Sequence, residues 1–494
     1  MSDFSELSVA LTGLEAEQVG MDTVGQNVAN ANTAGYVEES VQLGTLGPFA
    51  EEGITGVNSQ PGDGVQVEGI SRLTNTYLQS QSYTQQGLQG SLSAQQTGLQ
   101  SVQENFPEPA GNGISSELTQ YWQDWSNLAN NPSDSSAQTT VVQDGSTLAE
   151  SLNQTSNSLT ALSNQTVQNI TSTLSTVNQE ASQIANLNQS ILATNAGTNA
   201  SSDGSIAALE DQRDELVSQL SSQLGVQVSY NQDGTVNVYS GTESLVSGPN
   251  YQQLSLSSSG PPYSLVWSND QSTYQPSSGQ LAGMLDVVNN YVPSYQSSLD
   301  QVAQSLMGSV NYLMSTGYDQ AGNQGAPFFL GTGASNIEVN PALVSNPDLI
   351  GANASATPSG SDATNEDGTV AAEVGELPNS QTATMLVPAG GWSAGGSASS
   401  WTSGATTTTG TEADAAYNEL VTTVGQQTSS VNNQLTDQQT VTTNVNSALQ
   451  SATGVNTDQE LTNMVMYQNA YEATAKFMST VDTLLQSLIT MVNS

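Results

Sequence analysis

The chain has 494 residues and contains neither cysteine nor histidine, which excludes disulfide frameworks, thiolate metal sites, and Ser–His, Cys–His or histidine–metal chemistry. Its net charge is −42 because 45 acidic residues are set against only three basic ones, Arg72, Arg213 and Lys476. Nucleic acids and anionic membrane surfaces are bound by clustered Lys and Arg, so no nucleic acid and no membrane is expected as a partner.

The scarcity of basic residues has two physical interpretations. In strong acid most carboxyl groups are protonated, and few Lys and Arg then keep the net charge near zero. In high salt, or in alkali, an excess of acid is tolerated through screening. Because acids themselves are not enriched, the composition favours an acidic external medium, and better assembly at neutral pH than at about pH 3 would contradict this.

The first expected element is a helix within residues 1–36. Its large apolar residues recur at threes, fours and sevens, which is typical of one apolar helix face. The members of this row are Leu7, Leu11, Leu14, Met21 and Val28. The acidic start of the chain lacks the basic and then apolar layout of a cleaved secretory signal, and no apolar run is long enough to span a membrane.

The interior alternates between helical and strand-like patterns. Helices are predicted over residues 74–106, 114–130, 135–224 with an interruption at 195–205, 281–314, and 412–452. Residues 65–70 alternate as a short strand, and 226–239 form a hairpin around an Asn-Gln-Asp-Gly turn. Residues 326–411 are rich in Gly, Ser, Thr and Pro, with short strands near 337–339 and 383–387, as expected for an inserted lobe.

The last element is a long helix that begins after the capping sequence at residues 455–460. Its apolar row contains Leu461, Met464, Tyr471, Met478, Leu485 and Ile489. Each terminal row offers about half a dozen side chains worth roughly 1.5–3 kcal/mol each, whereas ordering the backbone costs roughly 1–2 kcal/mol per residue. We therefore predict that the ends fray in a free subunit and become stable when several copies pack together.

These patterns predict a mainly α fold with inserted β structure, in a nested multidomain arrangement. Residues 1–43 and 455–494 form an inner domain in which the terminal helices pair like a coiled coil. Residues 44–225, 278–325 and 412–454 form a rod of long helices. Residues 226–277 and 326–411 form one or more β-rich outer domains.

The charged residues have structural interpretations. Glu472 and Lys476 stand four apart in the favourable order for a helical ion pair, worth roughly 0.2–0.5 kcal/mol, and Arg213 has Glu210 three residues before it. A paired-carboxylate hydrolase using Glu210, Asp211, Asp214 and Glu215 is the catalytic alternative. Because a charge run on a helix is usually a solvated or ion-paired face, we expect no catalytic, cofactor or metal site. A sharper hypothesis is that Arg213 fixes the register against a neighbouring helix or subunit.

Two terminal motifs carry a family resemblance. Residues 27–36, NVANANTAGY, resemble the N-terminal signature of bacterial flagellar rod, hook and hook-associated proteins, with Ala34 where the family usually has proline. Residues 454–461 and 467–476 are similar to the matching C-terminal signature. Interior pieces at 64–72, 128–134, 211–216 and 279–286 narrow the resemblance to the hook-associated members. The family often has a basic residue after the tyrosine, whereas this chain has Val37, Glu38 and Glu39.

The resemblance implies a structural adaptor that self-assembles through its terminal helices, and it adds Asn30, Asn32, Gly35 and Tyr36 to the assembly interface. The implied partners are further copies of the chain, the flagellar hook protein, a second hook-associated junction protein and an export chaperone on the C-terminal helix. It also implies export through the flagellar type III apparatus to the extracellular flagellum. Two alternatives stay open: another axial protein such as the hook protein, and a secreted hydrolase or adhesin whose active lobe is residues 326–411.

Overall fold

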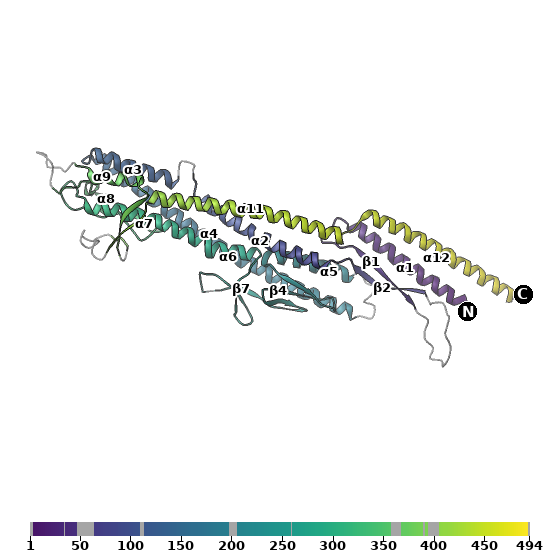
Figure 1. Cartoon of the computed structure of the whole chain (residues 1–494). Helices are drawn as coiled ribbons and strands as arrows, with labels where there is room; N and C mark the ends of the chain where they lie inside the picture. The colour runs from purple at the N-terminus through teal and green to yellow at the C-terminus, as the bar shows by residue number, and fades with distance from the viewer. Residues whose placement is uncertain are drawn as a thin grey trace.

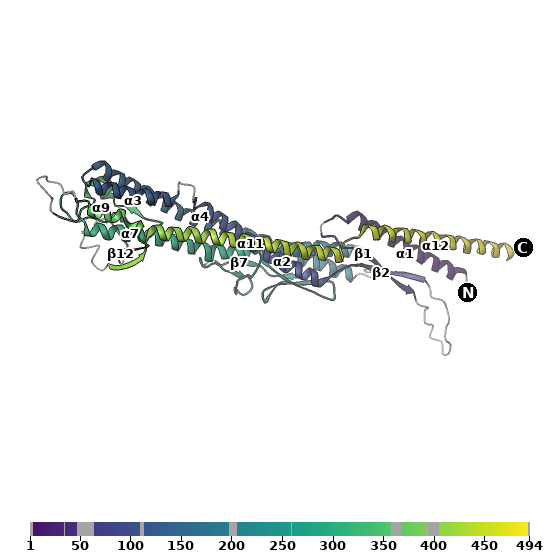
Figure 2. The same cartoon turned by 45° about the horizontal axis from the view of Figure 1, so that its top comes forward.

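The chain folds into an elongated molecule with three regions along its length (Figure 1). The computed structural model describes residues 3–33, 35–46, 64–108, 113–196, 205–257, 259–356, 367–388, 391–393 and 405–492. Both termini lie at one end, long helices run along the middle, and short helices and hairpins gather at the other end, which we call the far end. Figure 2 shows the same order from a second direction.

The terminal module consists of two helices and a hairpin. Helices α1 (Asp3–Asn30) and α12 (Thr457–Val492) lie side by side, with the two termini at the same end of the molecule. Strands β1 (Glu39–Leu46) and β2 (Gly64–Arg72) form an antiparallel hairpin that packs on α1. The predicted strand at 65–70 and both predicted terminal helices are therefore confirmed.

The rod is built mainly of long helices, and the two small sheets and the far-end segments lie in the chain between some of them. Its members are α2 (Thr76–Glu104), α4 (Ser135–Asn195), α5 (Ser205–Leu224), α6 (Gln280–Asp286), α7 (Val292–Thr316) and α11 (Ala413–Thr453). The Asn75 side chain accepts a hydrogen bond from Leu78 N at the start of α2, and Asp134 accepts one from Ser136 N at the start of α4. The predicted helix over 281–314 is present as α6 and α7, which are joined without a break by a π-helical turn, Val287–Tyr291.

Two small sheets lie beside the middle of the rod (Figure 1). The first has the order β3 (Gln227–Tyr230), β4 (Val236–Ser240), β5 (Glu243–Ser247), β6 (Asn250–Tyr251), and the second β7 (Leu254–Leu256), β8 (Leu265–Trp267), β9 (Thr273–Tyr274). The predicted hairpin is confirmed as β3–β4, and Gly234 in its turn has φ +85°, a conformation that glycine adopts without a steric cost.

The far end combines short helices with two hairpins. Its helices are α3 (Ile114–Asn130), α8 (Pro341–Ser345), α9 (Thr369–Gly375) and the 3₁₀ turns Pro347–Leu349 and Leu377–Asn379. Strand β10 (Phe329–Leu330) pairs with β11 (Glu338–Val339), and β12 (Thr382–Val387) pairs with β13 (Thr406–Thr411). The strands expected near 337–339 and 383–387 are thus present.

The fold is mainly α with inserted β structure, as predicted, but the β-rich segments do not share one outer position. Residues 226–277 lie beside the rod, because their apolar side chains join a core with α2, α4, α5 and α6. Residues 326–356 and the described parts of 367–411 lie at the far end instead. The division into three nested domains remains a proposal. None of the described helices is long and apolar enough to cross a membrane.

Two apolar cores stabilise the rod and the far end. The far-end core is built around α3 and the residues next to β10, where Tyr121, Trp125, Phe328 and Phe329 have ring centroids 4.8–6.2 Å apart. Helix α4 contributes to this core with its first half and to the core beside the sheets with its second half. None of the described residues of the terminal module belongs to either core.

Candidate assembly faces and the joint behind them

Helices α1 and α12 pair through small and polar side chains in a regular antiparallel register. A Cβ atom placed on Gly20 would lie 2.6 Å from the Tyr467 ring, and one placed on Gly13 would lie 3.4 Å from Thr474 Cγ2. The Asn27 side chain donates to Glu460 Oε2 at 2.9 Å. The three contacts recur every seven residues on both helices, which is coiled-coil spacing. The predicted coiled-coil-like pairing is therefore present, and its closest contacts are made at Gly13 and Gly20, which the apolar pattern did not mark.

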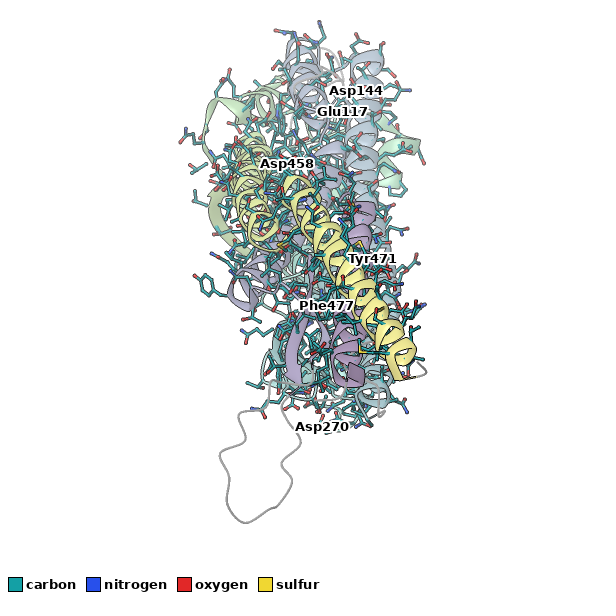
Figure 3. The ribbon with its side chains drawn as sticks, turned by 90° about the vertical axis from the view of Figure 1, so that its right-hand side faces the viewer. Glu117, Asp144, Asp270, Asp458, Tyr471 and Phe477 are labelled. Carbon is teal, nitrogen blue, oxygen red and sulfur yellow. The ribbon has the colours of Figure 1, made fainter. Side chains whose placement is uncertain are left out.

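The large apolar residues of the terminal module lie mostly outside this contact. Among its described side chains, the buried apolar residues are only Ala10, Ala16, Val24 and Val481. Eight large apolar side chains of α12 are 38–70% exposed: Leu461, Val465, Met466, Tyr471, Phe477, Leu484, Ile489 and Met491. Figure 3 looks at the molecule from the terminal end, where Tyr471 and Phe477 lie along α12. The module thus keeps apolar faces that its own chain does not cover.

The predicted interface residues fall into three groups. Exposed residues are Leu11, Asn32, Gly35, Leu461, Tyr471 and Ile489. Half-buried residues on the helices are Leu7, Leu14, Met21, Val28, Asn30, Met464, Met478 and Leu485. Tyr36 is turned inward, where its hydroxyl donates to Asn27 Oδ1 at 2.9 Å. Gly35 has φ +80°, so the chain reverses there into the hairpin. Ala34 lies outside the described residues.

Sequence analysis missed one exposed row on α12. Phe477, Leu484 and Met491 follow each other at intervals of seven, and Ala470 stands seven residues before Phe477. The interval was visible in the sequence. The row through Met464, Met478 and Leu485 is more continuous and dominates the apolar pattern of this helix.

Asn27 ties together the elements of the terminal module. It is 1% exposed. Its amide nitrogen donates to Glu39 O and Glu460 Oε2, and its amide oxygen accepts from Tyr36 Oη and Glu39 N, at 2.8–3.0 Å. All four hydrogen-bonding positions of the side chain are used. Asn27 therefore ties α1 to the start of β1 and to the start of α12.

A buried ionic group, which we call the arginine cluster, lies on the rod side of the joint between the terminal module and the rod. It consists of Arg72, Glu210, Asp211, Arg213 and Asp214. Arg72 Nη2 lies 2.5 Å from Asp211 Oδ1, and Arg72 Nη1 lies 3.0 Å from Asp214 Oδ2 and 3.5 Å from Glu210 Oε2. Burial raises the pKa of Asp211 to about 6, although the Arg72 guanidinium acts in the opposite direction.

The other arginine of the cluster acts within the rod. Arg213 is 1% exposed, donates to Asp214 Oδ1 at 3.2 Å and to Gly234 O at 2.7 Å, and lies 3.9 Å from Glu210. It therefore holds α5 against the β3–β4 turn of its own chain, and its shorter acidic contact is Asp214 rather than the predicted Glu210. The register-fixing hypothesis for a neighbouring subunit stays a prediction.

The predicted ion pair of Glu472 and Lys476 is not formed. Both side chains are exposed on α12, and the ion pairs found among the described residues all belong to Arg72 and Arg213. The electrostatic attraction in an exposed pair gains only a few tenths of a kcal/mol. The side-chain entropy lost when two long side chains are held together costs about as much. Lys476 therefore remains a solvated charge.

At the far end, buried carboxyl groups lie beside other carboxyl groups. Asp124 on α3 is 5% exposed and adjoins Asp144 on α4. Its pKa is raised to about 7, mainly by burial and secondly by the neighbouring Asp144. The pKa of Glu412, at the start of α11, is also raised to about 7, mainly by burial and secondly by the adjacent Asp414. One oxygen of Asp124 and one of Glu412 have no hydrogen-bond donor. These surroundings favour the protonated, neutral forms of Asp124 and Glu412.

The described residues offer no arrangement typical of catalysis or metal binding. No group of three or more acidic residues in the described ranges could hold a metal ion. Glu210, Asp211 and Asp214, three of the four carboxylates of the hydrolase alternative, are paired with the two arginines, and the fourth, Glu215, is exposed and accepts a hydrogen bond from Gln219. A cavity of about 550 Å³ lies between α7, α11 and the β12–β13 hairpin, and Glu419 is the acidic residue among its lining.

Comparison with known proteins agrees with this architecture. Residues 99–329 match the flagellar hook-associated protein FlgK helical domain, residues 445–491 the flagellar basal body rod FlgEFG protein C-terminal family, and residues 7–36 the flagella basal body rod protein family. Flagellar hook-associated protein 1 of Bacillus subtilis is 26% identical over 99% of this chain and 98% of its own length. The chain belongs to the flagellar hook-associated protein 1 family.

Two further relatives extend the family comparison. Flagellar hook-associated protein 1 of Salmonella typhimurium is 28% identical over 66% of this chain, a match that spans 59% of the Salmonella protein. The solved flagellar hook junction protein FlgK from Burkholderia pseudomallei has a TM-score of 0.59 and 18% identity, covering 75% of this chain and all of that structure. That likeness concerns the fold. Membership in the hook-associated protein 1 family makes the chain a structural component of the bacterial flagellum.

Proposed function

We propose that the chain is the junction between flagellar hook and filament and that it forms this junction by self-assembly through its terminal helices. The observation that carries the proposal is the α1–α12 contact. Its contacts at Gly13, Gly20 and Asn27 are made with Thr474, Tyr467 and Glu460, while eight large apolar side chains of α12 stay exposed. Each such side chain gains roughly 1.5–3 kcal/mol when it is fully buried. Neighbouring copies that cover these faces supply that burial.

The terminal module is the part that contacts further copies, and the elongated rod holds the far end away from it. The relatives are named for the flagellar hook, which supports the hook protein as the neighbour on one side. We propose a second hook-associated junction protein as the neighbour on the other side. The interface residues are those predicted from the sequence together with the row through Phe477 and Leu484.

We further propose that the chain leaves the cell through the flagellar export apparatus with a chaperone on α12. The exposed apolar faces support this, because a helix that exposes many large apolar side chains before assembly is a typical target for a partner that covers an amphipathic helix. The protein is not an enzyme in this proposal. Three of the four carboxylates considered for hydrolysis, Glu210, Asp211 and Asp214, are paired with arginine, which supports a structural role.

The test replaces two exposed side chains of α12 in one variant, Phe477→Ser and Leu484→Ser. Both positions are exposed, so the isolated subunit should keep its thermal unfolding temperature, whereas assembly of the purified chain should be lost. In cells that carry the variant as their only copy, filament protein should appear in the medium rather than on the hook. Electron microscopy and sedimentation measure the two outcomes.

The matched control is Val344→Ser on α8, which removes an equally exposed apolar side chain from the far end. It should leave assembly and filament attachment unchanged. Normal assembly of the double variant would overturn the proposed interface. Normal filament attachment in cells without this chain would overturn the junction role itself.

A further inference from the structure

We propose that Arg72 is a positioning residue that fixes the orientation of the terminal module relative to the rod. The inference rests on contacts within one chain, so it goes beyond the proposed assembly role and can fail independently of it. Arg72 is the last residue of β2 and its side chain is 4% exposed. Its ion-pair partners are all on α5, a helix of the rod.

The connection between the two parts is otherwise slender. The chain passes from the terminal module to the rod at residues 73–75, between β2 and α2, and at residues 454–456, between α11 and α12. Backbone hydrogen bonds join Glu38 N to Thr453 O at 2.9 Å and Leu73 N to Glu38 O at 2.8 Å. Neither of the two apolar cores extends across the joint. Two short connections alone would leave the orientation free to vary.

The Arg72 contacts limit this freedom because they add an attachment to α5, a rod helix that neither of the two chain connections enters. Glu210 and Asp211 are neighbours on α5, Asp214 lies one turn further on, and one guanidinium contacts all three. A planar guanidinium can bind several carboxylate oxygens in a fixed geometry, whereas an ammonium group acts as a point charge. The hairpin that ends at Arg72 packs on α1, so holding Arg72 against α5 also sets the direction of α1.

The placement of the few basic residues in this chain supports the same conclusion. Only three basic residues exist among 494, and two of them, Arg72 and Arg213, belong to this one cluster. Arg213 donates to Gly234 O and to Asp214, so the Asp214 carboxylate that receives Arg72 is itself held in place. Gln79 at the start of α2 also donates to Asp214 Oδ2 at 3.1 Å. The Asp214 carboxylate that contacts Arg72 is therefore held in a fixed position on α5.

The test measures the distance between the hairpin and the rod by pulsed electron resonance on the full-length chain. The chain has no cysteine, so Gln66→Cys on β2 and Gln439→Cys on α11, both at exposed positions, accept spin labels specifically. The parent should give one narrow distance distribution. Arg72→Gln should give a distribution at least about twofold broader, because several orientations become populated.

The matched control is Lys476→Gln, which removes the same charge from an exposed position that has no ion pair, and it should keep the narrow distribution. Arg72→Lys, which keeps the charge but loses the planar fork, should lie between the parent and Arg72→Gln. If Arg72→Gln unfolds the rod, seen as a lower thermal unfolding temperature, Arg72→Lys decides the question. A broad distribution in the parent, or narrow ones in both Arg72 variants, overturns the inference.

The same samples separate this inference from the proposed function. The double variant Phe477→Ser and Leu484→Ser should lose assembly and keep the narrow distance distribution. Arg72→Gln should show the broad distribution whether or not the chain still assembles. Broadening in the Phe477 and Leu484 variant equal to that in Arg72→Gln would mean that the terminal faces, and not Arg72, set the orientation, which also overturns the inference.

Discussion

The two ends of the molecule bury their apolar side chains to different extents. The far end encloses Trp125 and Phe328 completely within its own core. The terminal module buries four small or medium apolar side chains and leaves eight large ones of α12 exposed. A structure of the first kind is complete in one subunit. A structure of the second kind needs neighbouring molecules, which is what an assembling component requires.

The two ends also treat their carboxyl groups differently. At the joint, Arg72 and Arg213 face the acids of α5, and the guanidinium limits the rise in the pKa of Asp211 to about 6. At the far end, burial and neighbouring acids act in the same direction, and the pKa values of Asp124 and Glu412 reach about 7. The scarce basic residues are thus concentrated where two parts of the molecule must be held together.

The largest expected difference concerns backbone exchange. In a dilute free subunit, amides of α12 should exchange at least about a thousandfold faster than those of α3, because local opening of a poorly covered helix costs little free energy. Hydrogen exchange measured by mass spectrometry before and after assembly checks this, and protection of α12 should rise on assembly. Equal protection of the two helices in the free subunit would remove the distinction between the ends.

Removing a core aromatic side chain should damage only the far end. Trp125→Ala leaves a cavity among packed rings and should lower the free energy of unfolding by about 3–5 kcal/mol. Tyr77→Ala removes a ring that is 73% exposed and should change it by less than about 0.5 kcal/mol. Denaturant titration of both variants gives the comparison. A similar loss in the two would show that the far-end core is not the main source of stability.

Stability should depend on pH through the far-end carboxyl groups. Since the pKa values of Asp124 and Glu412 are raised in the folded state, the folded chain holds protons that the unfolded chain has released. Their contribution is fully present below about pH 4 and is lost as pH rises through about 7. The groups that face them are Asp144 for Asp124 and Asp414 for Glu412, and no described cation contacts either pair.

Thermal unfolding between about pH 4 and pH 8 measures this dependence. The variant with Asp124→Asn and Glu412→Gln should unfold at a temperature that varies less with pH and is higher than that of the parent at pH 8. Glu472→Gln, which changes an exposed acid of α12, should follow the parent curve. A parent that becomes more stable as pH rises from 4 to 8 contradicts the assignment, and with it the acidic medium favoured by the composition.

The smallest expected effect is within the terminal module. Asn27→Ala leaves Tyr36 Oη, Glu39 N and one oxygen of Glu460 without the partner they have now, which costs about 1–3 kcal/mol for buried polar groups. The loss should appear as faster exchange in the first residues of β1 and α12 and leave the far end unaffected. Asn32→Ala, at an exposed position, serves as the control. No change at β1 would mean that Asn27 does not tie these elements together.

The sequence predicted the long helices well because their apolar side chains recur at helical intervals, as they do through α4. It predicted the pairing of α1 with α12 but not its closest contacts. Periodic analysis searches for large apolar residues, whereas the close contacts are made by Gly13 and Gly20, which carry no apolar signal. Of the apolar row predicted for α1, Leu11 is exposed, whereas Leu7, Leu14, Met21 and Val28 are half-buried.

The joint could be predicted only in part. The motif that contains Asn27 and Tyr36 was recognised, but nothing near Arg72 indicates that its partners stand on a helix far along the chain. Such a contact depends on how β2 and α5 are placed in three dimensions. The contact between the carboxyl groups of Asp124 and Asp144 was missed for the same reason, since α3 and α4 bring together two acids that are separate in the sequence.

Helix α4 is an uninterrupted helix of 61 residues that lines one core with Leu148, Leu152 and Leu159 and the other with Ile170, Leu174 and Val177. One residue inserted between Leu159 and Ile170 would rotate every later side chain by about 100° and advance it by about 1.5 Å. The second set would then point away from the sheets while the first stayed in place. The number of residues between the two cores is therefore a constraint on how this chain can vary in length, and changes in length are better accommodated in its loops.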